Sequence, residues 1–246
     1  MRKRSSPSVR SGRVPLVRAL SKLGLASRKD AWTLIHAGRV KVDGVIARAG
    51  AALVAPDRAR ISIDDVETKR RARVVLLFHK PRGVVTTRRD PEGRRTVFDV
   101  LGAAADGLVS AGRLDMASTG LLILTNDTVF SNWLTDPVNR VPRRYVVTVR
   151  GALTDAEADR IRAGIQVTGR DDARERLSVS DLVVRKRSSR ETHVIVTLAE
   201  GKNREIRRLF DGVDHEVTRV HRVSFGEFEL GDLQPGAFRT HRSSHR

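Results

Sequence analysis

Residues 112–127 read GRLDMASTGLLILTND, and this stretch decides how the rest of the chain is interpreted. Its apolar run at 121–124, bounded by Gly and Asn-Asp, is typical of a short strand covered on both faces. Arg113 and Asp115 precede the strand two residues apart, so in extended backbone their side chains share one side. A neighbouring guanidinium keeps a carboxylate ionised, which nucleophilic catalysis by aspartate requires. A structural ion pair at a strand end fits these two residues equally well.

The charge balance of the chain points to a polyanionic partner. Its 246 residues contain 47 Lys and Arg against 29 Asp and Glu, a formal net charge of +18 with a pI of about 11.4. Nucleic acid is the simplest such partner. Residues 1–14 are expected to form a flexible basic arm and 239–246 a basic tail, because both carry basic residues and no acid.

Several absences in the sequence favour a cytoplasmic protein. There is no cysteine, so neither disulfides nor thiolate chemistry are expected. No apolar run approaches the roughly 20 residues of a membrane helix, and no apolar signal-peptide segment follows the basic N-terminus. The sequence also lacks zinc-ligand spacing, a P-loop and a dinucleotide fingerprint.

Residues 15–65 predict a small α/β module of two helices and a sheet. Leucines recur at helical spacing near its start, and Ser27 is placed to cap the second helix. Asp43-Gly44, flanked by valines, predicts a hairpin. The charged stretch 66–73 has no apolar periodicity and is interpreted as a linker.

Basic residues gather in this module where the second helix begins and at the hairpin. The string LGLASRKDAWTLIHAGRVKVDG (23–44) resembles the S4-type RNA-binding module, whose recurrent pattern is SRxxAxxLIxxGxVxVxG. The resemblance implies an RNA-contacting face, whereas the alternative is an ordinary solvated surface. The residues of this face are Arg28, Lys29, Arg39 and Lys41.

Two further segments of the region 74–238 carry candidate functional residues. A strand over 142–149 contains Tyr145, the only tyrosine, for which core packing and base stacking both stay open. The segment EGKNREIRRLF (200–210) predicts a helix with one apolar side, and Arg204, Arg207 and Arg208 share much of its opposite side. With Lys202 near its start, this helix suits anion binding better than a solvated charged face.

Three segments follow the S4-like module in order: FHKPRGVVTTRRDPEGRRTV (78–97), the central stretch, and EGKNREIRRLF. Together they resemble the bacterial ribosomal RNA pseudouridine synthases of the small-subunit and large-subunit single-site branch, over roughly residues 15–240. The differences are small. Ser118-Thr119 stands where Thr-Ser is usual, and Arg143 stands where lysine is common.

The resemblance implies an α+β fold. Residues 74–238 would form a catalytic domain with a mixed, mostly antiparallel sheet and a central cleft, preceded by a small α/β S4-like domain. The implied reaction breaks the uridine C1′–N1 bond and joins C5 to the same ribose carbon. The family implies neither a metal nor an organic cofactor.

The resemblance also assigns roles to residues. Asp115 would be the catalytic carboxylate, and Tyr145 the aromatic that stacks on the target base. Arg207 would pair with the aspartate, with Arg204 as the alternative, and Arg113 would support the motif. The remaining residues expected to bind RNA are Lys80, Arg82, Lys202, Arg204 and Arg208.

The expected partner is ribosomal RNA or a ribosome-assembly intermediate, with large-subunit RNA slightly preferred over small-subunit RNA, and the protein is expected to be a monomer. A different class of function remains open, a non-catalytic S4-domain RNA-binding or ribosome-assembly factor. It explains the charge but leaves residues 74–238 without a role. DNA binding is the least favoured, because no helix-turn-helix recognition helix or zipper is evident.

Overall fold

Strand β9 (Thr119–Thr125) contains the apolar run of the central stretch, and all of its residues after Thr119 are buried. Leu122 and Leu124 belong to one buried cluster, and Leu121 and Ile123 belong to another. Because successive side chains of a strand point to opposite faces, these clusters cover its two faces. The predicted strand with two covered faces is therefore confirmed.

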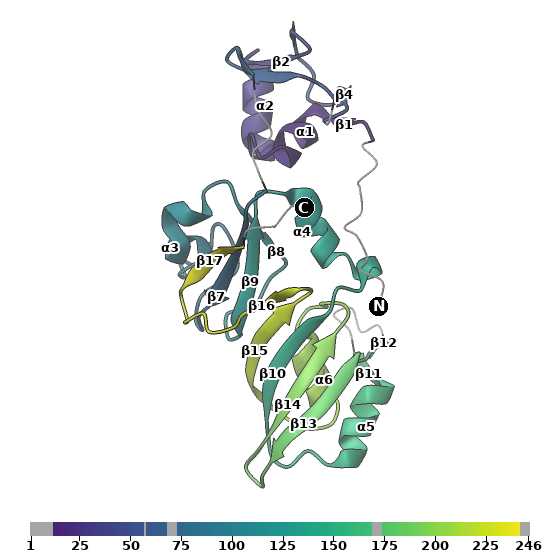
Figure 1. Ribbon diagram of the computed structural model, residues 1–246. Helices are drawn as coiled ribbons and strands as arrows, with labels where there is room; N and C mark the ends of the chain where they lie inside the picture. Colours follow the sequence, from purple (N-terminus) through teal and green to yellow (C-terminus); the bar gives the residue numbers. More distant parts are fainter. Residues whose placement is uncertain (1–11, 57, 68–72, 169–173, 242–246) are drawn as a thin grey trace. The chain divides into compact units, whose positions relative to one another are not determined.

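The chain is organised in two compact units (Figure 1). Unit 1 contains Met1–Arg73 with Asn126–Val129, and unit 2 contains Val74–Thr125 with Phe130–Arg246. Most of the predicted arm over 1–14 lies outside the described residues. The computed structural model describes residues 12–56, 58–67, 73–168 and 174–241.

Unit 1 has the two helices and the small antiparallel sheet expected for residues 15–65. Ser27 caps the second helix, because its hydroxyl accepts the Asp30 backbone N–H at 3.1 Å. Asp43 and Gly44 both have positive φ, as a tight hairpin turn requires. The elements are β1 (Val14–Pro15), α1 (Leu16–Lys22), α2 (Arg28–His36), β2 (Val40–Val42), β3 (Val45–Ile46), β4 (Leu53–Val54), β5 (Ile61–Ile63) and β6 (Val66–Glu67).

Unit 2 is built on a mixed, mostly antiparallel sheet, as the predicted fold class requires. Helix α4 (Thr128–Thr135) begins with two residues of unit 1 and continues into unit 2. Besides β9 and α4, the elements of unit 2 are β7 (Val75–Lys80), α3 (Val97–Leu101), η1 (Gly102–Ala105), β8 (Val109–Ala111), η2 (Pro137–Asn139), β10 (Arg143–Arg150), α5 (Asp155–Ala163), β11 (Ile165–Thr168), β12 (Arg174–Leu177), β13 (Asp181–Arg187), β14 (Glu191–Leu198), α6 (Glu205–Asp211), β15 (Val217–Phe225), β16 (Phe228–Glu229) and β17 (Phe238–His241).

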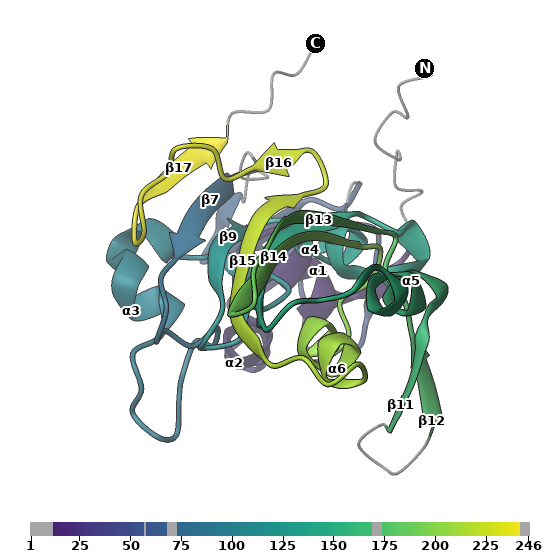
Figure 2. The same cartoon turned by 90° about the horizontal axis from the view of Figure 1, so that it is seen from below.

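The strand order of the main sheet is β13-β14-β10-β15-β9-β7-β17. All neighbours along this path are antiparallel except β15 and β9, which pair in parallel at His221–Thr119 and Arg222–Gly120. This parallel pair joins two antiparallel halves of the sheet. The helices α5 and α6 lie on one face of the half that contains β10, β14 and β15 (Figure 2).

Gly120 makes the parallel junction possible. A Cβ atom at this position would lie 2.2 Å from the Arg222 carbonyl oxygen and 2.6 Å from the Arg222 nitrogen. The φ of Gly120 is +106°, which side-chain-bearing residues rarely adopt. Gly120 therefore lets β15 approach the start of β9, which begins four residues after Asp115.

Three boundaries between predicted segments differ in the structure: those of the N-terminal arm, the linker and the C-terminal tail. Val14, placed in the arm, pairs with Val54, and the predicted linker begins with β6, which pairs with β5. At the other end, β17 pairs with β7, so the predicted tail begins inside the sheet. The partners of β1 and β17 are distant in the chain, whereas β6 is missed because it is only two residues long in a charged stretch.

Candidate active site

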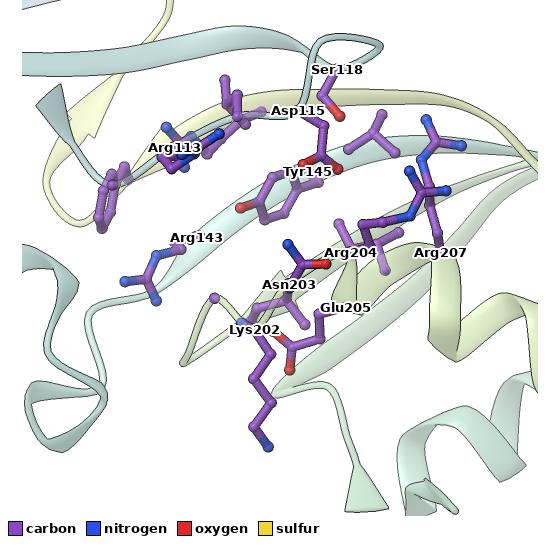
Figure 3. A pocket seen from close by; sticks show the side chains of 18 of the residues that line it. Arg113, Asp115, Ser118, Arg143, Tyr145, Lys202, Asn203, Arg204, Glu205 and Arg207 are labelled. Carbon is purple, nitrogen blue, oxygen red and sulfur yellow. Dashed lines mark hydrogen bonds between the residues drawn. The ribbon is translucent and has the colours of Figure 1, made fainter. Parts of the chain in front are cut away.

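A cavity of about 560 Å³ lies in unit 2, where the two halves of the sheet meet. Its walls come from the loop that precedes β9, from β10 and β15, and from the loop that enters α6. Figure 3 shows that Asp115, Tyr145, Asn203, Arg204 and Arg207 lie together from these separate segments, whereas the Lys202 side chain extends away from them. The cavity is the central cleft that the sequence predicts for the catalytic domain.

Asp115 lies on the loop before β9, and its carboxylate points into the cavity beside the ring of Tyr145 (Figure 3). The backbone on both sides of the aspartate is held by the segment that follows β7. Thr86 Oγ1 donates to the Leu114 carbonyl at 2.8 Å, and the Gly83 N–H donates to the Met116 carbonyl at 2.9 Å. These bonds hold the backbone on both sides of Asp115.

Lys80 completes this support from inside the protein. Its side chain is fully buried, and its ammonium donates to the carbonyls of Pro81, Met116 and Ser118 at 3.0, 3.4 and 2.8 Å. Burial lowers the pKa of Lys80 to about 8, and the negative charge of Asp115 acts in the opposite direction. The charge of Lys80 is thus turned inward rather than exposed, and its contact with RNA stays a prediction.

Tyr145 lies on β10 and is 7% exposed. Its ring belongs to the main buried cluster and also lines the cavity, between Asp115 on one side and Asn203 on the other in Figure 3. The two alternatives left open by the sequence, core packing and base stacking, are therefore compatible at this position. Stacking on a target base stays a prediction.

Arg207, in the first turn of α6, faces the same part of the cavity as Asp115 (Figure 3). Its guanidinium donates to the Val217 carbonyl at 2.5 Å. Burial and the positive charge of Arg204 lower the pKa of Arg207, while the charge of Asp115 opposes this shift. In the part of the chain that the structure describes, no cation forms an ion pair with Asp115. The predicted ion pair between Arg207 and Asp115 is therefore not formed in this structure.

The two other arginines predicted near Asp115 are placed differently from expectation. Arg204 is not on the face of α6: it is the N-cap residue, in left-handed conformation with φ 49°, and its side chain lines the cavity. Arg113 is exposed and also lines the cavity, but forms no ion pair with Asp115. The Ser118 N–H donates to the Asp115 carbonyl at 3.0 Å and closes a turn that begins at the aspartate.

Three buried charged residues of the cavity wall were not among the predicted site residues. The guanidinium groups of Arg143 and Arg222 lie 4.7 and 5.0 Å from the ring centre of Phe225. Arg143 donates to the Leu134 carbonyl at 3.1 Å, and Arg222 donates to the Leu121 carbonyl at 2.7 Å. Their burial follows from the sheet order, and only the unusual arginine at 143 gave a signal in the sequence.

Glu205, the third of these residues, is 3% exposed at the start of α6. One carboxylate oxygen accepts the Lys202 backbone N–H at 3.0 Å, and the other has no hydrogen-bond partner among the described residues. Burial raises the pKa of Glu205 to about 7, and the hydrogen bond from Lys202 opposes that shift. The cavity wall therefore holds a carboxyl group that changes charge near neutral pH.

The other basic residues predicted to bind RNA in unit 2 differ in availability. Arg82 is exposed. Lys202 pairs with Glu200 at 2.8 Å, and Arg208 pairs with Glu175 of β12 at 2.6 Å. Arg208 therefore holds the β11–β12 hairpin against α6, which the sequence did not indicate.

In unit 1, the four predicted basic residues fall into two pairs. Arg28 and Lys29 are exposed at the start of α2. Arg39 makes a bidentate ion pair with Asp64, at 2.7 and 2.5 Å, and Lys41 pairs with Asp65. The second pair is thus partly neutralised within the module.

Two further properties bear on the kind of protein. Over residues 12–56, 58–67, 73–168 and 174–241, no group of three or more His, Cys, Asp or Glu side chains is arranged to hold a metal ion. Within the same described ranges, no helix combines the length and apolar character needed to span a membrane.

Comparisons with known proteins agree with this geometry. A family model for RNA pseudouridylate synthase matches residues 74–211. The ribosomal large subunit pseudouridine synthase B of Vibrio vulnificus is 36% identical over 226 residues, covering 89% of this chain and 69% of the relative. The Bacillus subtilis protein of the same name is 32% identical over 222 residues, covering 90% of this chain and 89% of the relative.

A solved structure gives the same result for the fold. The crystal structure of a pseudouridylate synthase superposes with a TM-score of 0.66 at 25% identity, covering 93% of this chain and 96% of that chain. These matches define an isomerase that acts on RNA. The chain belongs to the RNA pseudouridylate synthase family, as its motifs predict.

Proposed function

We propose that the protein isomerises a specific uridine of large-subunit ribosomal RNA, with Asp115 as the catalytic carboxylate. The placement of Asp115 carries the proposal, because it is the carboxylate that a clamped loop directs into the cavity beside the only tyrosine. The choice of large-subunit RNA rests on the names of the relatives. Acting on ribosomal RNA, such an enzyme would work in the cytoplasm.

The reaction keeps every atom of the substrate. The C1′–N1 bond of uridine breaks, the uracil turns, and a C1′–C5 bond forms, while C5 loses a proton and N1 gains one. A base inside a helix offers no access to these atoms, so the target uridine must be extruded into the cavity. The ring of Tyr145 would stack on the extruded base, and the base would displace water from Asp115.

The cationic side chains around Asp115 would stabilise negative charge as the glycosidic bond changes. Arg207 and Arg204 lie on the Asp115 side of the cavity, and Arg113 lines its rim. The field of Asp115 already acts on Arg207 without an ion pair. A substrate that excludes water would strengthen this attraction, because the local dielectric falls, and the Arg207–Asp115 pair would close at that stage.

Unit 1 would bind the RNA as an S4-type module. Arg28 and Lys29 are exposed there and available for phosphate contacts. Phosphate neutralisation supplies affinity without sequence information, so the module would hold the RNA while the cavity selects the uridine.

We propose that one chain contains all residues required for the reaction and acts as a monomer.

The test of the site is Asp115→Asn. Transcripts of large-subunit ribosomal RNA labelled with tritium at uridine C5 release the label when C5 loses its proton. We expect the variant to bind the transcript as the wild type does and to release no label above background. The exposed Asp181→Asn, on β13, is the matched control and should release label at the wild-type rate. Label release by Asp115→Asn would overturn the assignment.

The test of the substrate is to map pseudouridines in both ribosomal RNAs from cells with and without the gene. We expect one modification of the large-subunit RNA to disappear, and to return only with a copy that retains Asp115. Loss of a small-subunit modification instead would refute the large-subunit assignment while leaving the reaction intact. Full rescue by Asp115→Asn would favour the non-catalytic assembly factor.

A further inference from the structure

Trp32 stands out on the surface of unit 1. It lies in the middle of α2 and is 44% exposed, whereas Ala31 and Ile35 of the same helix are fully buried in the core of the module. Tryptophan has the largest apolar side chain, and its exposure is costly unless a partner covers it.

The indole is held in one orientation from two sides. His36, one helical turn further on, stacks against it with ring centroids 5.4 Å apart and ring planes inclined by 20°. A Cβ atom on Gly50 would lie 2.7 and 2.8 Å from two atoms of the ring. The absence of a side chain at Gly50 therefore leaves room for this edge of the six-membered ring. A ring fixed in this way loses little conformational entropy when a planar ligand stacks on it.

The charges next to Trp32 suit an anionic ligand. Arg28 precedes Trp32 by one helical turn, so the two side chains lie on the same side of the helix. Lys29 is the next residue after Arg28. Both are exposed, and neither forms an ion pair within the described part of the chain. The acid nearest in sequence, Asp30, accepts the Ser27 hydroxyl at 2.6 Å in the helix cap.

We propose that Trp32 is a stacking platform for an unpaired base of the RNA substrate, and that Arg28 and Lys29 neutralise the phosphates beside that base. A polyanion with planar apolar groups matches a fixed aromatic ring flanked by cations. In a duplex the bases are stacked on each other and withdrawn from such a ring. The inference rests on the proposed RNA substrate and specifies that unit 1 recognises a single-stranded or bulged segment.

The two tryptophans of the chain provide a direct measurement. In Trp133→Phe, the tryptophan fluorescence, excited at a wavelength that tyrosine does not absorb, comes from Trp32 alone. We expect saturable quenching when this variant is titrated with single-stranded oligouridylate, and little change with an RNA duplex at the same phosphate concentration. In the reciprocal variant Trp32→Phe, the remaining Trp133 fluorescence should not follow oligouridylate binding.

Affinity supplies the second measurement, by anisotropy of a labelled oligouridylate. We expect Trp32→Ala to weaken binding about ten-fold, within the range for removal of one base–aromatic contact, and Trp32→Phe to keep most of the affinity. The slope of log affinity against log salt should be unchanged in Trp32→Ala, because no phosphate contact is lost. In Arg28→Gln/Lys29→Gln the slope should fall by about 1.4, since each neutralised phosphate on a single strand contributes about 0.7.

Two results would overturn the proposal. One is binding of oligouridylate, seen by anisotropy, without quenching of Trp32. The other is an equal loss of affinity for single strands and duplex in Trp32→Ala, which would show that Trp32 supports the module rather than a base. Because both measurements record binding without turnover, they can be made with Asp115→Asn as well. A failure here is therefore distinguishable from a failure of the proposed catalytic role.

Discussion

Lys80 shows how far the environment of one residue can depart from its appearance in the sequence. In the string FHKPRG it reads as one of several cations available to phosphate, yet it is fully buried. The strand β7 pairs with β9, which places Lys80 opposite Gly120 and next to the loop that holds Asp115. Its ammonium then satisfies carbonyl groups of that loop, so we assign it a positioning role.

Lys80→Met tests this role, because it keeps the aliphatic length and removes the donors. The carbonyls of Met116 and Ser118 lose a charged partner, so we expect a loss of about 1–3 kcal/mol in unfolding free energy and a fall in turnover of roughly ten-fold or more as Asp115 is displaced. RNA affinity and its salt slope should not change. Urea unfolding, label release and anisotropy measure the three quantities.

Arg82→Gln is the control for that experiment, since Arg82 is exposed two residues further on. It should lower the salt slope of RNA binding by about 0.7–0.9. If Lys80→Met also lowered this slope while turnover of bound RNA stayed intact, Lys80 would be an RNA contact after all.

Glu205 predicts a pH dependence of stability. Its pKa is raised by burial from 4.5 to about 7, so the folded protein holds this proton more tightly than the unfolded chain does. The stabilisation by the protonated form is complete below about pH 4.5 and is lost as the pH rises through 7. Glu205→Gln resembles the protonated form. Relative to wild type, the variant should therefore gain up to about 3 kcal/mol between pH 4.5 and 8.

Urea unfolding of both proteins at a series of pH values measures this gain. The exposed Glu216→Gln serves as control, because Glu216 pairs with Arg150 at the surface and its side chain is 65% exposed. A stability difference between Glu205→Gln and wild type that does not vary with pH would contradict the assignment.

At the scale of elements, the parallel pairing of β15 with β9 is the contact on which the cavity depends. It brings Arg222 and Phe225 of β15 to the same space as the loop of Asp115. The pairing covers only two residue pairs, yet it joins the two antiparallel halves of the sheet. A single change at the point of closest approach should therefore affect both stability and catalysis.

Gly120→Ala is that change. The added Cβ atom would lie 2.2 Å from the Arg222 carbonyl oxygen, so the strands must separate, and we expect a loss of more than about 3 kcal/mol. Gly93→Ala is the matched control: Gly93 also has a positive φ, but a Cβ atom added there would meet nothing within 4 Å. It should lose only about 1–2 kcal/mol. Equal losses in urea unfolding would show that strand approach is unimportant.

At the scale of the whole molecule, the positive charge is distributed unevenly, and residues 1–11 carry Arg2, Lys3, Arg4 and Arg10 without an acid. Deleting residues 1–11 leaves the pairing of Val14 with Val54 intact. If all four cations neutralise phosphates, the salt slope of RNA binding should fall by about 3. Anisotropy at several salt concentrations measures it, and an unchanged slope would show that these residues do not contact RNA.

Local features of the chain were predictable because neighbouring residues produce them. The cap of α2 at Ser27 and the hairpin at Asp43-Gly44 each involve residues within a few positions of one another. The apolar run of β9 also predicted a single structure, because a strand without a polar face must be covered by other residues on both of its faces.

The sequence by itself thus determined the family, the central strand and the identity of the candidate carboxylate. Tertiary structure alone decided the surroundings of Asp115: that Lys80 turns inward, that Arg204 caps α6, and that Arg113 forms no ion pair with it. The physical reason is separation along the chain. These environments depend on the order of β7, β9, β10 and β15 in the sheet, and such long-range pairings leave almost no trace in the local pattern of residues.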